Sequence, residues 1–98
     1  MSKQIIWSPA AEKDAEQILD FINTKWNKRV TAKFLNKLDD NIRLISETPK
    51  LFPVIEDNLG VRKCVVTKQN SLFYRISNET IEIIRLFDTR QNPKSLTF

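Results

Sequence analysis

The chain has 98 residues, of which 41% are hydrophobic and 29% charged, and its formal net charge is +4. A chain of this size has room for one hydrophobic core and not for two, so we predict a single domain over residues 1–98. With one glycine and four prolines in all, the composition excludes a linker-rich, collagen-like or disordered chain.

The numbers of cysteine and histidine residues limit the kinds of bonds, metal sites and catalysis that this chain can support. Cys64 is the only cysteine and there is no histidine, which excludes an internal disulfide, most zinc sites and the commonest general base. We therefore expect no cofactor and no metal, and we interpret Cys64 as a small buried strand residue. The start "MSKQIIW" lacks the apolar run of a signal peptide, and no long apolar segment follows, so we expect a cytoplasmic protein without a membrane partner.

The positive charge is concentrated in the C-terminal part of the chain. Residues 1–58 hold nine basic and nine acidic side chains, whereas residues 59–98 hold seven basic and three acidic ones. This asymmetry suits an anionic partner, either nucleic acid or an acidic protein segment, and it is also compatible with a solvated basic face that binds nothing.

The first half of the chain predicts a strand and two helices. "KQIIW", residues 3–7, has the pattern of a short strand, and Ser8 followed by Pro9 is typical of a helix start. Apolar residues then recur at spacings of three and four up to Trp26, and a second such stripe runs from Val30 to Ile45 before Pro49 ends it. The short connection "NKRV" favours an antiparallel helical hairpin.

The second half changes to a period of two. After an irregular loop that ends at Gly60, three strands are predicted in "VRKCVV", "SLFYRI" and "TIEIIRLF" (residues 61–66, 71–76 and 80–87), with connections of hairpin length. The last run is apolar on both faces, with Ile81, Ile83 and Phe87 on one and Ile84 and Leu86 on the other, so we expect an inner strand. The predicted fold is α+β, in the order strand-helix-helix-strand-strand-strand, with the helical hairpin packed on an antiparallel sheet.

A family resemblance rests on the order of strands and helices, on the opening "IIWSPAAEKDAEQI" and on the segment "SLFYRISNETIEIIRLFDTRQNPKSL". Over about residues 3–96, the chain resembles the RelE/ParE superfamily of type II toxin–antitoxin toxins. The resemblance implies a plasmid-stabilisation type toxin that arrests growth and is neutralised by a cognate antitoxin. It also implies one of two targets, because RelE-like members cut mRNA on the ribosome and ParE-like members inhibit DNA gyrase.

RNA cleavage would need cations near the phosphate and groups that transfer protons. The basic candidates, for phosphate stabilisation or for target binding, are Arg62, Lys63, Arg75, Arg85 and Arg90. Glu56 and Tyr74 are the proton-transfer candidates, although a solvated carboxylate and a packed ring are the ordinary interpretations of these two residues. The histidine–tyrosine pair of many nuclease members is missing, which favours the ParE-like branch over the RelE-like ribonuclease; an inactive antitoxin-binding relative is the third possibility.

The segment "IIRLFDTRQNP" contains the densest charge of the last strand. Arg85 shares the expected face of Ile81 and Ile83, and a partly buried arginine usually needs a partner. An ion-pair network of Arg85, Asp88 and Arg90 would end the sheet, and the same network could hold an arginine platform for function. Trp7 and Trp26 could stack on bases, but we expect them to pack in the core or at the helix hinge.

Overall fold

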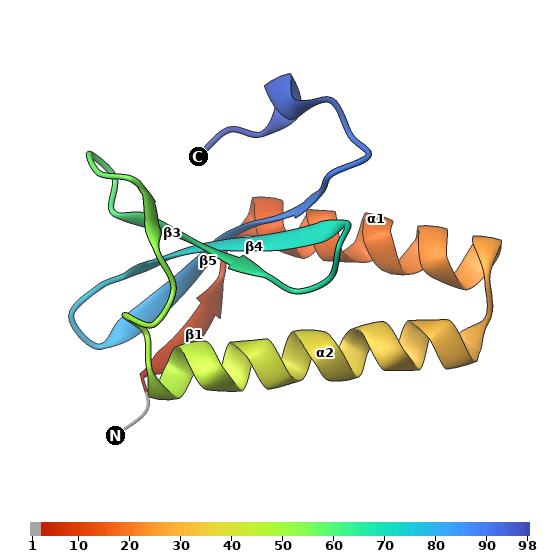
Figure 1. Cartoon of the computed structure of the whole chain (residues 1–98), viewed down its shortest axis with the longest axis horizontal. Coiled ribbons are helices and arrows are strands. Elements are labelled where there is room, and N and C mark those ends of the chain that lie inside the picture. The colour runs from red at the N-terminus through yellow and green to blue at the C-terminus, as the bar shows by residue number, and fades with distance from the viewer. Residues whose placement is uncertain (1–2) are drawn as a thin grey trace.

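The computed structural model describes residues 3–98 and contains two helices packed on one face of a five-stranded sheet (Figure 1). The elements are β1 (Gln4–Trp7), α1 (Pro9–Lys25), α2 (Lys28–Glu47), β2 (Val54–Glu56), β3 (Val61–Val65), β4 (Asn70–Ile76), β5 (Thr80–Asp88) and a short 3₁₀ turn (Pro93–Ser95). The predicted α+β order is confirmed, with one addition: the loop after α2 contains the short strand β2.

Local side chains set the ends of the helical hairpin. The Ser8 hydroxyl accepts a hydrogen bond from the Ala11 N–H at 3.0 Å, with Pro9 in the first turn. The side chain of Asn27 caps α2 in the same way by accepting from the Val30 N–H. The two helices lie side by side and are joined at one end of the molecule by a very short connection (Figure 1), as the sequence predicted.

The sheet has the strand order β1-β5-β4-β3-β2, so β5 is an inner strand as expected. Strands β2 to β5 pair antiparallel, but β1 pairs with β5 in parallel, from Gln4 opposite Thr80 to Trp7 opposite Ile83. The sheet is therefore mixed, because the helical hairpin carries the chain away from β1 and the sheet resumes only at its far edge.

A bulge in β5 alters the faces that the sequence predicted. Phe73 pairs with Arg85 and Tyr74 with Ile83, which leaves Ile84 as an extra residue between the two pairs. Leu86 therefore joins Ile81 and Ile83 on the helix side of the sheet, and Phe87 lies with Ile84 on the other side. The predicted division of β5 was wrong beyond Ile83 because strict alternation cannot anticipate an inserted residue.

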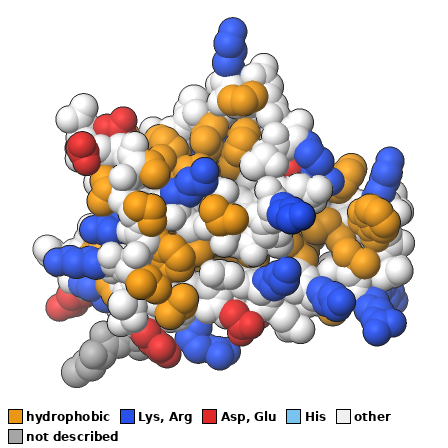
Figure 2. Space-filling view, viewed as in Figure 1, with side chains coloured by type: hydrophobic (Ala, Val, Ile, Leu, Met, Phe, Trp, Pro, Cys, Tyr) orange, Lys and Arg blue, Asp and Glu red, His pale blue; other side chains and the backbone are white. Residues whose placement is uncertain are grey.

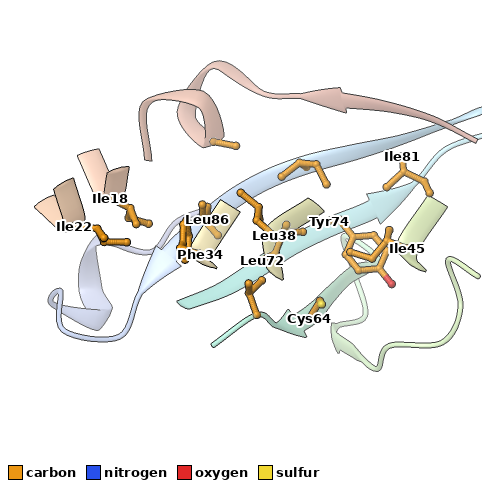
Figure 3. Close-up of a cluster of buried hydrophobic side chains, with 13 residues drawn as sticks. Ile18, Ile22, Phe34, Leu38, Ile45, Cys64, Leu72, Tyr74, Ile81 and Leu86 are labelled. Atoms are coloured by element: carbon orange, nitrogen blue, oxygen red, sulfur yellow. The ribbon is translucent and has the colours of Figure 1, made fainter. Parts of the chain in front are cut away.

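The main core lies between the helices and the sheet (Figure 3), where side chains from both helices meet those of the central strands. Its fully buried members include Ile45, Leu72 and Tyr74, and Cys64 is also fully buried, as predicted. A smaller cluster of Val61, Phe73 and Phe87 lies on the other face under the C-terminal segment, which contributes Leu96. The C-terminal segment thus covers part of the face opposite the helices.

The only glycine takes the backbone conformation that favours it. Gly60 has a φ of +66° in the loop between β2 and β3. This is the left-handed region of backbone conformation, which residues with a Cβ rarely adopt. Within residues 3–98, no helix is long and apolar enough to cross a membrane.

Candidate functional site

The five predicted basic residues do not form one cluster. Lys63, Phe73 and Arg85 are in register across β3, β4 and β5, on the face that the helices leave free. Arg75 lies on the same face of β4, where its guanidinium binds Glu82 at 2.8 Å. Arg62 is paired with Tyr74 instead and therefore belongs to the helix face.

Arg85 forms the most buried ion pair that the structure describes in residues 3–98, and its partner is Asp14 of α1. Its Nε and Nη2 donate to the two carboxylate oxygens of Asp14 at 2.7 and 3.0 Å, and the two side chains are only 14% and 10% exposed. The carboxylate also accepts from the Leu86 N–H at 3.1 Å. These hydrogen bonds raise the pKa of Arg85, so its charge is fixed.

Asp14 is a residue that the sequence reasoning missed. It lies three positions after Ala11 and four before Ile18, within the apolar stripe of α1, and it is buried. A carboxylate in such a stripe indicates a buried cationic partner, and this signal was present in the sequence. The sequence does not show which residue is that partner, because 71 residues separate Asp14 from Arg85.

The expected network of Arg85, Asp88 and Arg90 was therefore only half right. Asp88 and Arg90 do pair, with Arg90 Nε donating to both carboxylate oxygens at 2.9 and 3.1 Å, and this contact lowers the pKa of Asp88. Arg85 takes no part in it. The Arg90 guanidinium lies over the ring of Phe21 on α1, 4.6 Å from its centroid, which holds it by a cation–π contact.

Arg85 also holds the C-terminal segment. Its Nη1 donates to the carbonyl oxygens of Ser95 and Thr97, each at 3.3 Å. Phe98 then packs against Phe73, with the ring centroids 5.2 Å apart. One arginine thus ties α1, β5 and the end of the chain together, which is a structural role.

Arg62 and Tyr74 fasten the loop that follows α2. The Arg62 guanidinium donates to the carbonyl oxygens of Lys50 and Phe52, and the Tyr74 hydroxyl donates to that of Pro49 at 2.6 Å. Tyr74 is fully buried (Figure 3), and burial raises its pKa to about 12. The packed-ring interpretation of Tyr74 is the one that the structure supports.

Glu56 lies at the end of β2 and is partly exposed. Its carboxylate accepts from the backbone N–H of Asn58 at 2.9 Å, which stabilises the turn toward Gly60. Lys63 differs from the other basic candidates, since no ion pair or side-chain hydrogen bond of Lys63 is found among residues 3–98. The basic candidates thus occupy separate positions, and among residues 3–98 neither Glu56 nor Tyr74 forms an ion pair or a side-chain hydrogen bond with any of them.

The two tryptophans differ. Trp7 packs against the main core, as expected, whereas Trp26 at the C-terminal end of α1 is 64% exposed. The expectation that Trp26 packs was wrong because α1 ends there and the chain turns into α2 before the ring can be covered.

Comparison with solved structures shows which proteins share this fold. The chromosomal ParDE toxin–antitoxin system of P. aeruginosa matches with a TM-score of 0.74 at 16% identity, covering 89% of this chain and 96% of that one. A YoeB/ParE toxin from Agrobacterium tumefaciens matches at 0.64 and 22%, covering 87% and 96%. The E. coli DinJ-YafQ complex matches at 0.63 and 15%, covering 92% and 96%. The fold is that of the RelE/ParE toxins.

Sequence comparison gives the family. Residues 5–93 match the family model described as ParE toxin of the type II toxin–antitoxin system parDE, and the chain belongs to this family. Toxin ParE1 of Mycobacterium tuberculosis is 28% identical over 94 residues, which cover 94% of this chain and 95% of that protein. The predicted RelE/ParE resemblance is confirmed.

Proposed function

We propose that this ParE-family toxin arrests growth in the cytoplasm by binding DNA gyrase, as in the ParE-like branch, and that it does not cleave RNA. The proposal rests on the burial and contacts of Tyr74 and Glu56, the two residues considered for proton transfer. A ribosome-dependent nuclease needs an accessible proton-transfer group close to cations that can reach the phosphate. Both proton-transfer candidates are engaged in structural contacts instead.

Tyr74 is fully buried and its hydroxyl is held by Pro49, so it cannot reach a ribose or a leaving oxygen. Glu56 is engaged with the Asn58 N–H at the far edge strand of the sheet. The chain has no histidine that could replace them. A binding toxin needs none of these groups, and the family match and the likeness to Toxin ParE1 support the same branch.

We also propose a cognate antitoxin as partner. Several similar structures are described as toxin–antitoxin systems or complexes, including the ParDE system of P. aeruginosa and the DinJ-YafQ complex. The free face of the sheet presents Lys63 and the partly exposed Arg75, and an acidic antitoxin segment would complement this charge.

The test of the target is induced expression in a bacterial host without antitoxin, with pulse labelling of DNA and protein synthesis in one culture. We expect DNA synthesis to stop first, and purified toxin to inhibit supercoiling by gyrase. Coexpression of a cognate antitoxin is the control that separates specific arrest from the burden of expression.

Two results would contradict the proposal. An early stop of protein synthesis with cleaved mRNA would place the chain with the ribosome-dependent nucleases. Continued growth at high levels of folded protein would instead identify an inactive relative that binds an antitoxin.

A further inference from the structure

A pocket of about 410 Å³ lies between the end of the helical hairpin and the turn that joins β3 to β4. Ile22 and Phe34 from the two helices supply apolar lining, and Thr67 and Asn70 line it from the turn. Its volume falls in the range of pockets that bind small molecules. Of the seven candidate site residues considered above, only Arg90 lines this pocket.

The rim of the pocket is cationic. Lys33 and Lys37 lie one turn apart on α2, so both side chains face the same side, and Arg90 approaches from the end of β5. No acidic side chain is among the described residues that line the pocket. Figure 2 shows Lys and Arg side chains surrounding an apolar area on the side of the molecule where the helical hairpin turns.

A buried hydrogen-bond acceptor is left over in the wall. Asn70 is only 3% exposed, and its amide nitrogen donates to the Thr67 hydroxyl oxygen at 3.0 Å. The other end of the amide, Oδ1, is buried and has no partner among residues 3–98. Buried polar atoms are nearly always paired, so a ligand toward which the Asn70 side chain turns, and which donates a hydrogen bond to Oδ1, would remove an unfavourable feature.

Trp26 adds a flat aromatic surface at the mouth of the pocket. It is 64% exposed, whereas a tryptophan is usually mostly buried. An exposed ring beside lysines and an arginine is suited to binding a nucleotide. The flat π face of the base can stack on the ring, and the phosphate on the sugar can contact the basic side chains.

We propose that this pocket binds a nucleotide whose base carries an exocyclic amino group. The base stacks on Trp26, its amino group donates to Asn70 Oδ1, and its phosphate contacts Lys33 and Lys37, with Arg90 remaining paired with Asp88 beside them. A base, an N–H donor and an anion in one small ligand match the three features of the pocket together. This binding does not depend on the target of the toxin, so it can be tested separately from gyrase inhibition.

The test is isothermal titration calorimetry of the purified full chain with AMP, IMP, adenosine and inorganic phosphate at low ionic strength. IMP is the matched ligand, since it has a carbonyl where AMP has the amino group. We expect saturable binding of AMP that is about tenfold tighter than that of IMP, because a carbonyl oxygen facing Oδ1 leaves that acceptor unpaired. Adenosine and phosphate alone should bind more weakly than AMP.

Three variants locate the site. Trp26→Ala should weaken AMP binding about tenfold through lost stacking, and Trp26→Phe should restore most of it. In the double variant Lys33→Ala and Lys37→Ala, AMP should bind no more tightly than adenosine, because the phosphate has lost its basic partners. Lys13→Ala, an exposed lysine of α1 that does not line the pocket, is the control and should bind AMP normally.

The outcomes separate two sources of the ligand. A short oligoadenylate that binds no tighter than AMP would identify a free nucleotide, and one that binds much tighter would identify a nucleic-acid strand; both support the proposal. No saturable binding of AMP at millimolar concentration overturns it. Equal binding of AMP, IMP and phosphate that is unchanged in Trp26→Ala also overturns it, since only an anion site would remain.

Discussion

The hydroxyl of Tyr74 donates to the Pro49 carbonyl, and this contact connects the centre of the sheet to the loop after α2. The ring itself contacts Phe52 edge to face, with centroids 6.5 Å apart. The role of this residue is therefore to hold the loop in place. A variant without the hydroxyl tests whether Tyr74 contributes only to stability or also to growth arrest.

We predict that Tyr74→Phe lowers the free energy of unfolding by about 1 kcal/mol, because one hydrogen bond is lost while the packed ring remains. Growth arrest should be unchanged. Urea unfolding followed by circular dichroism measures the first effect and colony counts after induction the second. A folded Tyr74→Phe protein that no longer arrests growth would show that Tyr74 takes part in chemistry.

The Asp88–Arg90 pair gives a prediction for the pH dependence of stability. Arg90 holds the pKa of Asp88 below its ordinary value, so the carboxylate stabilises the fold above about pH 4. This contribution is lost as the pH falls through the lowered pKa of the folded state. Asp88→Asn should therefore unfold at lower urea concentration at pH 7 and approach the wild-type midpoint at acidic pH. Parallel midpoint curves for the two proteins from pH 2 to 7 would refute this account.

At the scale of elements, the join between α1 and β5 determines the architecture. Where β1 ends, the first turns of α1 continue along the edge of β5: the Ser8 N–H donates to the Ile83 carbonyl at 2.9 Å, and the Ser8 hydroxyl donates to that of Ile84. Asp14 then accepts from the Leu86 N–H. Polar side chains of the helix thus take over the pairing that a longer β1 would have supplied.

We predict that Asp14→Ala destabilises the protein by about 3–5 kcal/mol, because it leaves the Arg85 guanidinium buried without its partner. Glu16→Ala, an exposed change on the same helix, should alter stability by less than about 0.5 kcal/mol and serves as the control. Thermal or urea unfolding of both proteins measures the difference. Similar stability of the two variants would mean that the pair contributes little.

Mutation of Arg85 damages the fold as well as any binding surface. Arg85→Ala removes the contacts to Asp14, Ser95 and Thr97 together, so a loss of growth arrest in this variant would reflect a damaged fold. Lys63 and Arg75 are better probes of binding, because the Arg75 side chain is 46% exposed and no ion pair of Lys63 is found among residues 3–98.

At the scale of the whole molecule, the two faces carry different charge. A groove over the helices and β1 has an apolar floor with Glu12, Glu16 and Asp39 along it, whereas the free face of the sheet presents Lys63 and Arg75. Acidic partners are therefore expected at the sheet and disfavoured in this groove.

We predict that Lys63→Glu weakens antitoxin binding about tenfold or more, through a slower association that depends on salt. Lys13→Glu, an exposed charge reversal on α1, should leave the affinity unchanged. Surface plasmon resonance at two salt concentrations measures both rates. Equal affinity of Lys63→Glu and wild type at low salt would place the antitoxin elsewhere.

The sequence by itself determined the features that depend on neighbours along the chain. The start of α1 follows from Ser8 and Pro9 and the end of α2 from Pro49, although residues 28–30, predicted as part of the connection, belong to α2. The alternation of β4 correctly placed Leu72 and Tyr74 on the side opposite Phe73. Caps and periodicity act over a few residues, and for this reason they can be recognised in the sequence.

Tertiary structure alone decided which distant groups meet. The parallel pairing of β1, the bulge at Ile84, the Asp14–Arg85 pair and the pocket around Asn70 each join segments far apart in the chain. The cost of burying a charge or an amide says that a partner is needed, but many residues of the right type could supply it. Only the packing of the helical hairpin on the sheet selects one of them.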